Sequence, residues 1–308
     1  MRKTNRVYGI LAVGAYMANF NADLSGYPKT TASNQIFGSD KALKYPMKRM
    51  WQMQGEPVLY IKSMKCDEKS KNMQPRDLNE RYTYLFGALD EKTPSNEVLG
   101  KLFSAIDVMN FGATFAEKKQ NISITGAVQI NQGYNRFFQN TNVLSQDILS
   151  PFRNSNEKSE DKLASSMGTK IVTDEAHYVY SFSVNPENYA DFIGLVDGFE
   201  GYTVEVYEKF KWAARVATTA FNTNSKSGCE NELAVFIELK EDSQLFLANL
   251  DRYVVVQKKE EKVLYDLTKL EEVLAPHQEE IQSVEIYSNP VTVEVDYGTL
   301  RCSCYDIY

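Results

Sequence analysis

The stretch from residue 170 to 185, KIVTDEAHYVYSFSVN, constrains the fold of this 308-residue chain more than any other. Its side chains alternate between two sides, with Tyr178, Tyr180 and Phe182 on one and Val179, Ser181 and Ser183 on the other. A period of two is typical of a β-strand, because successive side chains of a strand point to opposite faces of its sheet. The chain is therefore expected to contain a sheet to which this strand belongs.

The remaining segments give an order of elements. Strands are expected at 6–17, 57–63, 110–116, 122–130, 232–240, 252–258 and 283–296, and helices at 39–54, 77–87, 96–107, 202–221 and 267–275. With a long insertion after the first helix set aside, the order is βαββαβ, as in ferredoxin-like and RNA-recognition-type folds. The predicted fold class is α+β, and an order that so many proteins share does not define a function.

Two segments leave alternatives open. Ser39 is a suitable N-cap for the helix at 39–54, but Pro46 removes a mid-helix hydrogen bond, so the helix either kinks at Pro46 or begins there. The stretch 132–169 is rich in Asn and Ser and too long for a plain connector. It is either a functional excursion or a disordered loop.

Composition bears on location. The chain has no run of 18 apolar residues, so no membrane span is expected. The N-terminus resembles a signal peptide only superficially, since Gly, Tyr and Asn interrupt its apolar part and no A-x-A-like site follows. Among four cysteines, Cys302 and Cys304 are the close pair, and C-x-C without a second pair or a nearby His is a weak zinc motif. A reduced cytosolic protein without a metal or cofactor is predicted.

Catalytic motifs are sparse. The two histidines, His177 and His277, are interpreted as structural, and no G-x-S-x-G, P-loop, H-E-x-x-H or evident carboxylate pair in an apolar pocket is found. Asp23 stands out because its loop, ANFNADLSGYPKTTASN, is rich in short hydrogen-bonding side chains. This loop is either a polar lip over a phosphate chain or a turn built from turn-forming residues.

The charge is uneven along the chain. The whole chain has a net charge of -7, but the segment 29–65 holds seven basic and two acidic residues, a net charge of +5. From residue 230 to the end there are seven basic and 17 acidic residues, a net charge of -10. The overall balance argues against a free-standing nucleic-acid binder, whereas the local balance permits one when neighbouring subunits share the work.

The basic segment centres on the first helix. Lys41, Lys44 and Lys48 are spaced to share one helical face, where Asp40 is the one acidic residue expected at pairing distance. The face is either an ordinary solvated surface or a contact for a phosphate backbone.

Two more stretches have similar alternatives. SITGAVQINQGYNRFF, 123–138, offers amides, an Arg and aromatic rings to a sugar-phosphate strand, or core residues around a turn. SSMGTKIV, 165–172, offers a Met wedge between bases, or a gap-filling Met.

Several blocks occur in the order of one known family. They are Asn19, Asn21 and Asp23 followed by Pro28 and Lys29; SDKALK at 39–44; DVMNFG at 107–112; ITGAVQ at 124–129; MGTKIV at 167–172; and YSFSVNP at 180–186 before the long helix. From about residue 6 to residue 240 the chain thereby resembles the backbone subunit of Cascade-type CRISPR surveillance complexes. This is the Cas seven family of the RAMP superfamily, and the resemblance is greatest to its type I-B branch.

The resemblance implies a ferredoxin-like, RNA-recognition-type palm at 1–54, 109–131 and 170–308, with fingers inserted at 55–108 and a thumb at 132–169. It implies a non-catalytic, cytoplasmic subunit whose copies polymerise along a guide RNA, the crRNA, and present it for pairing with target DNA in antiviral defence. The implied partners are crRNA, target DNA through the guide, further copies of the chain and other Cascade subunits, with no membrane. The implied RNA-binding residues are Asn19, Asn21, Lys29, Ser39, Lys41, Lys44, Lys48, Arg49, Gln129, Asn135, Arg136, Met167 and Lys170.

Some residues depart from the family pattern. Met109 stands where the family often has Arg, Tyr45 stands where it has a further basic residue, and Pro46 is unexpected in the first helix. The acidic segment after residue 230 carries no motif and is expected to face neighbouring subunits. Two alternatives stay open: a metal-dependent RNA endonuclease of type III kind that uses Asp23, and an unrelated scaffolding protein with a ferredoxin-like core.

Overall fold

The computed structural model describes residues 1–67, 69–149 and 167–308. Its centre is an antiparallel set of strands in which β1 (Val7–Ala18) lies between β10 (Met167–Val184) and β11 (Cys229–Leu239). The sheet continues beyond β11 through β14 (Ile281–Ser288) to β16 (Ser303–Asp306), and beyond β10 to β7 (Val128–Ile130), β8 (Gly133–Asn135) and β2 (Phe37–Gly38). The strands predicted at 6–17, 170–185 and 232–240 are confirmed.

The two faces of β10 confirm the predicted alternation. Tyr178, Tyr180 and Phe182 belong to the larger buried core on one face of the sheet. Val179 belongs to a second core on the opposite face. Ser181 is also buried, and its hydroxyl accepts a hydrogen bond from the backbone N–H of Leu250 at 2.9 Å.

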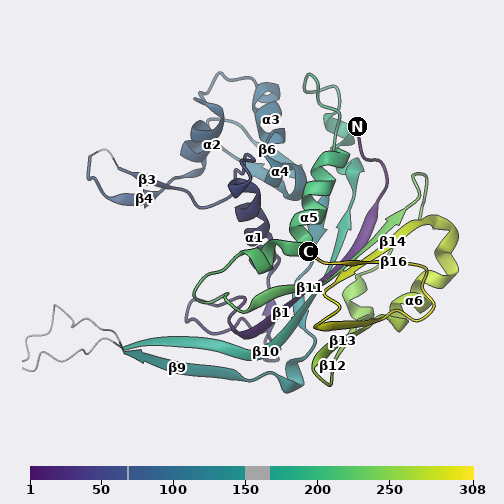
Figure 1. Cartoon of the computed structure of the whole chain (residues 1–308). Helices are drawn as coiled ribbons and strands as arrows, with labels where there is room; N and C mark the ends of the chain where they lie inside the picture. The colour runs from purple at the N-terminus through teal and green to yellow at the C-terminus, as the bar shows by residue number, and fades with distance from the viewer. Residues whose placement is uncertain (68, 150–166) are drawn as a thin grey trace, which may run out of the picture.

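Two helices cover the first face, α1 (Asp40–Met53) and α5 (Val204–Ala220) (Figure 1). The hydroxyl of Ser39 caps α1 by accepting the backbone N–H of Ala42 at 3.2 Å. Pro46 is buried inside α1, so the predicted helix at 39–54 is confirmed and does not begin at that proline. The indole N–H of Trp51 donates to the carbonyl of Lys209 at 3.2 Å and ties α1 to α5.

The chain between α1 and β7 forms a separate group of short elements (Figure 1). They are β3 (Met64–Cys66), β4 (Met73–Pro75), α2 (Leu78–Phe86), α3 (Ser95–Phe103), α4 (Ile106–Phe111), β5 (Gly112–Phe115) and β6 (Ile122–Thr125). The helices predicted at 77–87 and 96–107 are present, the second as two helices, α3 and α4.

Three strand predictions in this group are wrong in part or in whole. Residues 57–63 form no strand, because the carboxylate of Asp107 takes the N–H groups that a ladder would use. The strand predicted at 122–130 breaks at Gly126, which lies against Gly112: a Cβ added to Gly126 would be 2.3 Å from the backbone nitrogen of Gly112. The strand predicted at 110–116 begins only at Gly112, since α4 extends to Phe111.

The acidic C-terminal third covers the second face of the sheet. Its elements are β12 (Val255–Lys259), β13 (Lys262–Asp266), α6 (Thr268–Leu274) and β15 (Val293–Asp296). Leu250, Tyr265 and Leu270 pack there in the second core. The helix predicted at 267–275 is confirmed, whereas the strand predicted at 283–296 is two strands, β14 and β15, in different sheets.

A two-stranded arm projects from the body (Figure 1). It consists of β9 (Val143–Leu149) and residues 167–173 of β10, paired antiparallel from Thr173 opposite Val143 to Met167 opposite Leu149. The predicted excursion at 132–169 thus contributes β8 and β9, and its residues 150–166 lie outside the described part of the chain.

Short 3-10 helices complete the described chain: η1 (Phe138–Asn140), η2 (Pro186–Phe192), η3 (Leu250–Tyr253) and η4 (Ala275–Glu280). Among the described residues, no helix combines the length and the apolar character that a membrane crossing requires.

Candidate nucleic-acid interface

A groove of about 680 Å³ runs beside the N-terminal half of α1. Lys41, Lys44 and Lys48 line one wall, which confirms that the three lysines share a face. The opposite wall comes from Tyr60 and from residues 111–114, at the junction of α4 and β5. Ammonium groups neutralise phosphates in nucleic-acid complexes, so this wall is a candidate contact for a phosphate chain.

Two of the groove lysines are already paired with carboxylates. Lys44 contacts Asp40 at 2.9 Å, and Lys48 lies 3.5 Å from Asp107 and donates to the carbonyl of Tyr60 at 3.1 Å. The prediction that Asp40 is the one acid on this face is therefore wrong, because Asp107 reaches it from α4. Burial lowers the pKa of Lys48, and the charge of Asp107 opposes that shift only in part.

Asp107 fixes the backbone at Tyr60, which lines the far wall of the groove. Its two carboxylate oxygens accept the backbone N–H groups of Leu59 and Tyr60, each at 2.8 Å, and its side chain is buried. The Tyr60 hydroxyl donates to the carbonyl of Thr114 at 2.6 Å. Burial and the neighbouring Asp107 charge raise the pKa of Tyr60 to about 12, so this phenol stays neutral.

Lys41 and Asp40, in the first turn of α1, also line the groove. Lys41 is exposed and has no acidic partner within the described residues. Asp40 also accepts a hydrogen bond from the side chain of Gln132, at 3.3 Å. Burial opposes ionisation of Asp40, but the bonds from Lys44 and Gln132 lower its pKa overall.

Arg49, predicted with these lysines, is not in the groove. It lines a separate, largely apolar cavity of about 300 Å³ between the C-terminal ends of α1 and α5, together with Met53 and Phe221. Its guanidinium donates to the side-chain oxygen of Gln52 at 2.5 Å. The helical period carries Arg49 to another side of α1 from Lys44 and Lys48.

The Asn side chains of the polar loop after β1 form hydrogen bonds within the protein itself. Asn19 is buried and donates to the carbonyls of Gly26, at 2.9 Å, and Ile171, at 3.2 Å. Asn21 accepts the hydroxyl of Ser39 at 3.0 Å, which ties the loop to the start of α1. Lys29 is half-buried, and its backbone pairs with both Asn21 and Phe37.

Asp23 acts as a turn former. Its carboxylate accepts the backbone N–H groups of Ser25 at 2.8 Å and Tyr27 at 3.0 Å. This geometry agrees with the interpretation of the loop as a turn. No group of three or more His, Cys, Asp or Glu side chains suited to a metal ion occurs in residues 1–67, 69–149 and 167–308.

The residues predicted near the base of the arm have separate surroundings. Gln129 is exposed on β7 and lines a different cavity, near residues 247–249. Asn135 is fully buried, so its side chain is inaccessible to a ligand in this conformation. Arg136 forms an ion pair with Asp251 at 2.6 Å. Asn135 and Arg136 therefore hold the base of the arm together, which a polar composition alone does not distinguish from ligand binding.

Met167 and Lys170 lie on the arm itself. Lys170 stands opposite Gln146 in the ribbon, on the same face as the exposed Leu144 and Ile148. Met167 pairs with Leu149 at the outer end of the described ribbon. A face that combines apolar side chains with a lysine is compatible with a nucleotide contact, and the roles of both residues stay predictions.

Sequence reasoning missed two basic features. Lys226, in the loop after α5, donates to the carbonyl of Phe20, and burial lowers its pKa. A second groove of about 770 Å³ lies between the β3–β4 hairpin and α2, lined by residues that include Lys65, Lys69, Arg76 and Tyr84. The Arg76 guanidinium stacks 4.4 Å from the centre of the Tyr84 ring. The lysine-rich stretch 62–71 was the available signal for this groove.

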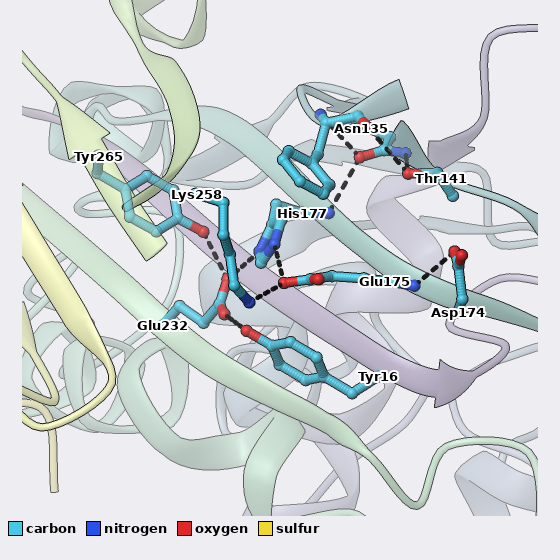
Figure 2. Close-up of polar contacts among 10 residues, drawn as sticks. Tyr16, Asn135, Thr141, Asp174, Glu175, His177, Glu232, Lys258 and Tyr265 are labelled. Atoms are coloured by element: carbon cyan, nitrogen blue, oxygen red, sulfur yellow. Dashed lines mark hydrogen bonds and ion pairs between the residues drawn. The ribbon is translucent and has the colours of Figure 1, made fainter. Parts of the chain in front are cut away.

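A second polar cluster surrounds His177 at the start of the arm (Figure 2). His177 is fully buried, and its ring nitrogens contact Glu232 at 2.7 Å and Glu175 at 3.3 Å. The interpretation of His177 as structural agrees with this burial. Strands distant in sequence bring Glu175 and Glu232 to one imidazole. Glu175 is partly exposed and the surroundings are polar, so this cluster is not a carboxylate pair in an apolar pocket.

The fold and the groove define a class: an α+β protein with a lysine-lined groove along its first helix and a projecting two-stranded arm. The chain belongs to the family described as CRISPR-associated protein Cas7, whose model matches residues 5–275. The family predicted from the sequence blocks is thereby confirmed. The type I-B branch stays a prediction.

Solved structures are similar over nearly the whole chain. One is a chain of a "CRISPR RNA-guided surveillance complex, pre-nicking", with a TM-score of 0.57 and 12% identity, covering 98% of this chain and 96% of that chain. Another is a chain of a "CRISPR RNA-guided surveillance complex", with a TM-score of 0.52 and 14% identity, covering 97% and 95%. These likenesses show the fold. No curated protein sequence matches the chain.

Proposed function

We propose that the chain is a non-catalytic guide-RNA-binding backbone subunit of a type I CRISPR Cascade complex, of the I-B branch. Its copies polymerise along crRNA and present it for pairing with target DNA in antiviral defence. Membership of the Cas7 family supports this proposal, as does the description of the two similar solved chains as parts of RNA-guided surveillance complexes.

The lysine groove is the observation that carries the proposal. An ammonium group has three N–H donors, so Lys44 keeps donors for a phosphate oxygen while it contacts Asp40. Lys41 is exposed at the same wall. Neutralising phosphates releases counterions, which gives affinity without reading sequence. Base pairing then supplies the specificity, while the protein holds the backbone.

We assign the strands β11, β1, β10 and β7, with α1 and α5, to an RNA-recognition-type palm. Their antiparallel pairing supports this assignment. The full palm is 1–54, 109–131 and 170–308, the fingers are 55–108, and the thumb is 132–169. Because the C-terminal third covers the second face of the sheet, we place the guide along α1 and under the arm rather than across the strands.

The partners follow from the same assignment. Further copies of the chain and other Cascade subunits bind beside it on the guide, and target DNA binds through the guide. Repetition along one RNA raises the effective concentration of each copy and compensates for the modest charge of a single groove. We place the complex in the cytoplasm, which the four free cysteines support.

The endonuclease alternative needs Asp23 as a catalytic carboxylate. In the structure two backbone N–H groups of the turn bind one oxygen of that carboxylate, Oδ1, so Asp23 has a local role as a turn former. This local role, together with the similarity of the sequence blocks to the type I branch, favours the non-catalytic assignment. Incubation of the assembled complex with complementary RNA and Mg²⁺ tests it: uncut RNA is expected, and regularly spaced cuts that Asp23→Ala abolishes would establish the enzyme instead.

Extraction and sequencing of the nucleic acid that co-purifies with the chain from its native host tests the proposal as a whole. We expect RNA with a constant repeat part and a variable spacer part. Purified protein that carries no nucleic acid, and absorbs in the ultraviolet as protein alone, would favour the scaffolding alternative. Substitution of Lys41 and Lys44 by Ala should reduce the amount of RNA recovered.

A further inference from the structure

The root of the arm is joined to the body by a continuous chain of polar side chains (Figure 2). Glu232 on β11 contacts Nδ1 of His177 at 2.7 Å, and Glu175 contacts Nε2 at 3.3 Å. Lys258 on β12 donates to Glu175 at 2.7 Å. This series of side-chain contacts therefore links the central sheet, through β10, to the C-terminal third.

A β-bulge turns Glu232 toward this cluster. β1 pairs Ala12 with Leu233 and Val13 with Asn231, so Glu232 is the extra residue of β11. Strict alternation from Ala234 and Phe236, which lie in the first core, would send Glu232 toward the helices. The bulge instead places its carboxylate on the side of the C-terminal third, as bulges re-aim side chains.

The surroundings of the Glu232 carboxylate are built to hold a charge. The hydroxyls of Tyr16 and Tyr265 donate to its two oxygens, each at 2.5 Å. Gly14 leaves it room, since a Cβ added there would be 2.4 Å from one of these oxygens. Glu232 is 1% exposed, and carboxylates buried to this degree are as a rule paired with a cationic group.

His177 supplies that cation. Burial opposes its protonation, but the charges of Glu232 and Glu175 raise the pKa of His177 to about 9. The hydrogen bond from His177 and the nearby Lys258 lower the pKa of Glu175 to about 2. The other titratable groups that face the imidazole are Glu230 on β11, whose pKa burial raises, and the phenols of Tyr16 and Tyr265, whose pKa burial also raises.

The backbone of His177 fixes the chain that leads to β9. Its N–H donates to the side-chain oxygen of Asn135 at 3.0 Å, and its carbonyl accepts the N–H of Arg136 at 2.9 Å. A few residues further on, Asn142 donates both its backbone and its side-chain N–H to Asp174 at 2.7 Å. The segment that leads into β9 is thus hydrogen-bonded to the backbone of His177, and His177 lies on β10, the other strand of the arm.

We propose that His177 is a positioning residue that sets the direction in which the arm leaves the sheet. Held as a cation between Glu232 of the body and Glu175 at the root, it keeps the arm fixed against the C-terminal third. Loss of its charge or its bonds releases the arm while the lysine groove stays intact. The inference rests on the proposed function only for the statement that the arm lies over the guide RNA.

Hydrogen–deuterium exchange of the RNA-free protein tests the positioning directly. At pH 6.5 and at pH 9.5, with rates corrected for base catalysis of exchange, the wild-type arm (143–149 and 167–173) is expected to exchange about ten times faster at the higher pH, one decade corresponding to ~1.4 kcal/mol. His177→Gln should show the faster arm exchange already at pH 6.5 and lose the pH dependence. Exchange in α1 and α5 should accelerate much less than exchange in the arm in both proteins.

Two further variants separate positioning from general destabilisation. His277→Gln is the matched control, since His277 lies on η4, and it should behave as wild type. Glu175→Gln removes one contact at the half-buried end of the cluster, and it should reproduce part of the arm effect where His177→Gln fails to fold. Arm exchange that is independent of pH in wild type, or faster exchange that spreads equally to α1, overturns the inference.

Binding of a uniform single-stranded RNA at pH 7.5 connects the arm to the guide. His177→Gln should weaken binding about tenfold while leaving the slope of log affinity against log salt unchanged, because no phosphate contact is removed. An altered slope contradicts a positioning role. If wild type binds no RNA at all, the proposed function fails, whereas the exchange result on the RNA-free arm still decides the inference.

Discussion

The Lys44–Asp40 pair in the groove on α1 and the His177–Glu232 pair at the root of the arm each join a basic to an acidic side chain, but the first is partly open to solvent and the second is sealed by burial. Lys44 and Asp40 keep 16% and 24% of their side chains exposed, while His177 and Glu232 keep 0% and 1%. An open ion pair can take up another partner, whereas breaking a sealed pair leaves an uncompensated buried charge. The groove should therefore respond to RNA and salt, and the cluster to denaturant and pH.

The largest effect is expected from Glu232→Ala. The substitution leaves a buried imidazolium and two buried phenols without their acceptor, which should lower the free energy of unfolding by ~3–5 kcal/mol. Urea denaturation measures the change. Glu294→Ala is the matched control, because the pair of Glu294 with Lys259 is exposed and should contribute far less to stability. Equal, small changes in the two variants would remove the distinction between sealed and open pairs.

The next effect is a loss of stability at alkaline pH. The pKa of His177 is raised from 6.5 to about 9 in the folded chain, so its stabilisation is complete below about pH 6.5 and is lost as pH rises through 9. The free energy of unfolding should fall by on the order of 2–3 kcal/mol over this window. Urea midpoints from pH 6 to 10 test this. A decline of the same size in His177→Gln would assign the pH dependence to other groups.

A smaller effect is expected in the groove from Lys41→Ala combined with Lys44→Ala. Each lost contact with a single-stranded phosphate should reduce the steepness of log affinity against log salt by ~0.7, so the pair should reduce it by ~1.4. Titrations of RNA between 50 and 200 mM salt measure the slope. Lys48 should add less, since it is already held by Asp107. Arg49→Ala, outside the groove, should leave the slope unchanged, and a change there would relocate the phosphate path.

The smallest effect is expected from Asp40→Asn. Removal of this carboxylate frees Lys44 for phosphate and makes the groove more positive, which should strengthen RNA binding by up to ~1 kcal/mol, about fivefold. The helix should lose ~0.3–1 kcal/mol because an acidic residue near its N-terminus is removed. Parallel RNA titrations and urea denaturation separate the two changes. Weaker binding at unchanged stability would mean that Asp40 positions Lys44 rather than competing for it.

Local sequence patterns predicted most of the helices and strands of the central sheet layer. The alternation at 170–185 and the Ser39 cap gave β10 and α1, because each pattern is decided by neighbours in sequence. Residues 57–63 were mistaken for a strand because their partner is a side chain about 47 residues away, Asp107. The family blocks, read in order, gave the family.

In the lysine groove, only the part that lies on α1 could be predicted from the sequence. The spacing of Lys41, Lys44 and Lys48 gave the shared face, but no local signal places Asp107 beside Lys48. Asn135 was selected for its polarity, and the fold uses that polarity to bind the backbone of His177. The bulge at Glu232 depends on a register between two strands more than 200 residues apart in the chain, which residue patterns do not encode.

The acidic C-terminal third, which covers the second face of the sheet, affects which RNA sequences the chain can bind. Open-faced sheets of this general shape hold bases against aromatic rings on their strands, and those rings favour some bases over others. Here that surface is filled by Leu250, Tyr265 and their neighbours. In the proposed arrangement, an RNA bound to the ammonium groups along α1 has its bases away from the strands of the sheet. One subunit would then accept guides of any sequence, and a newly acquired guide would need no change in the protein.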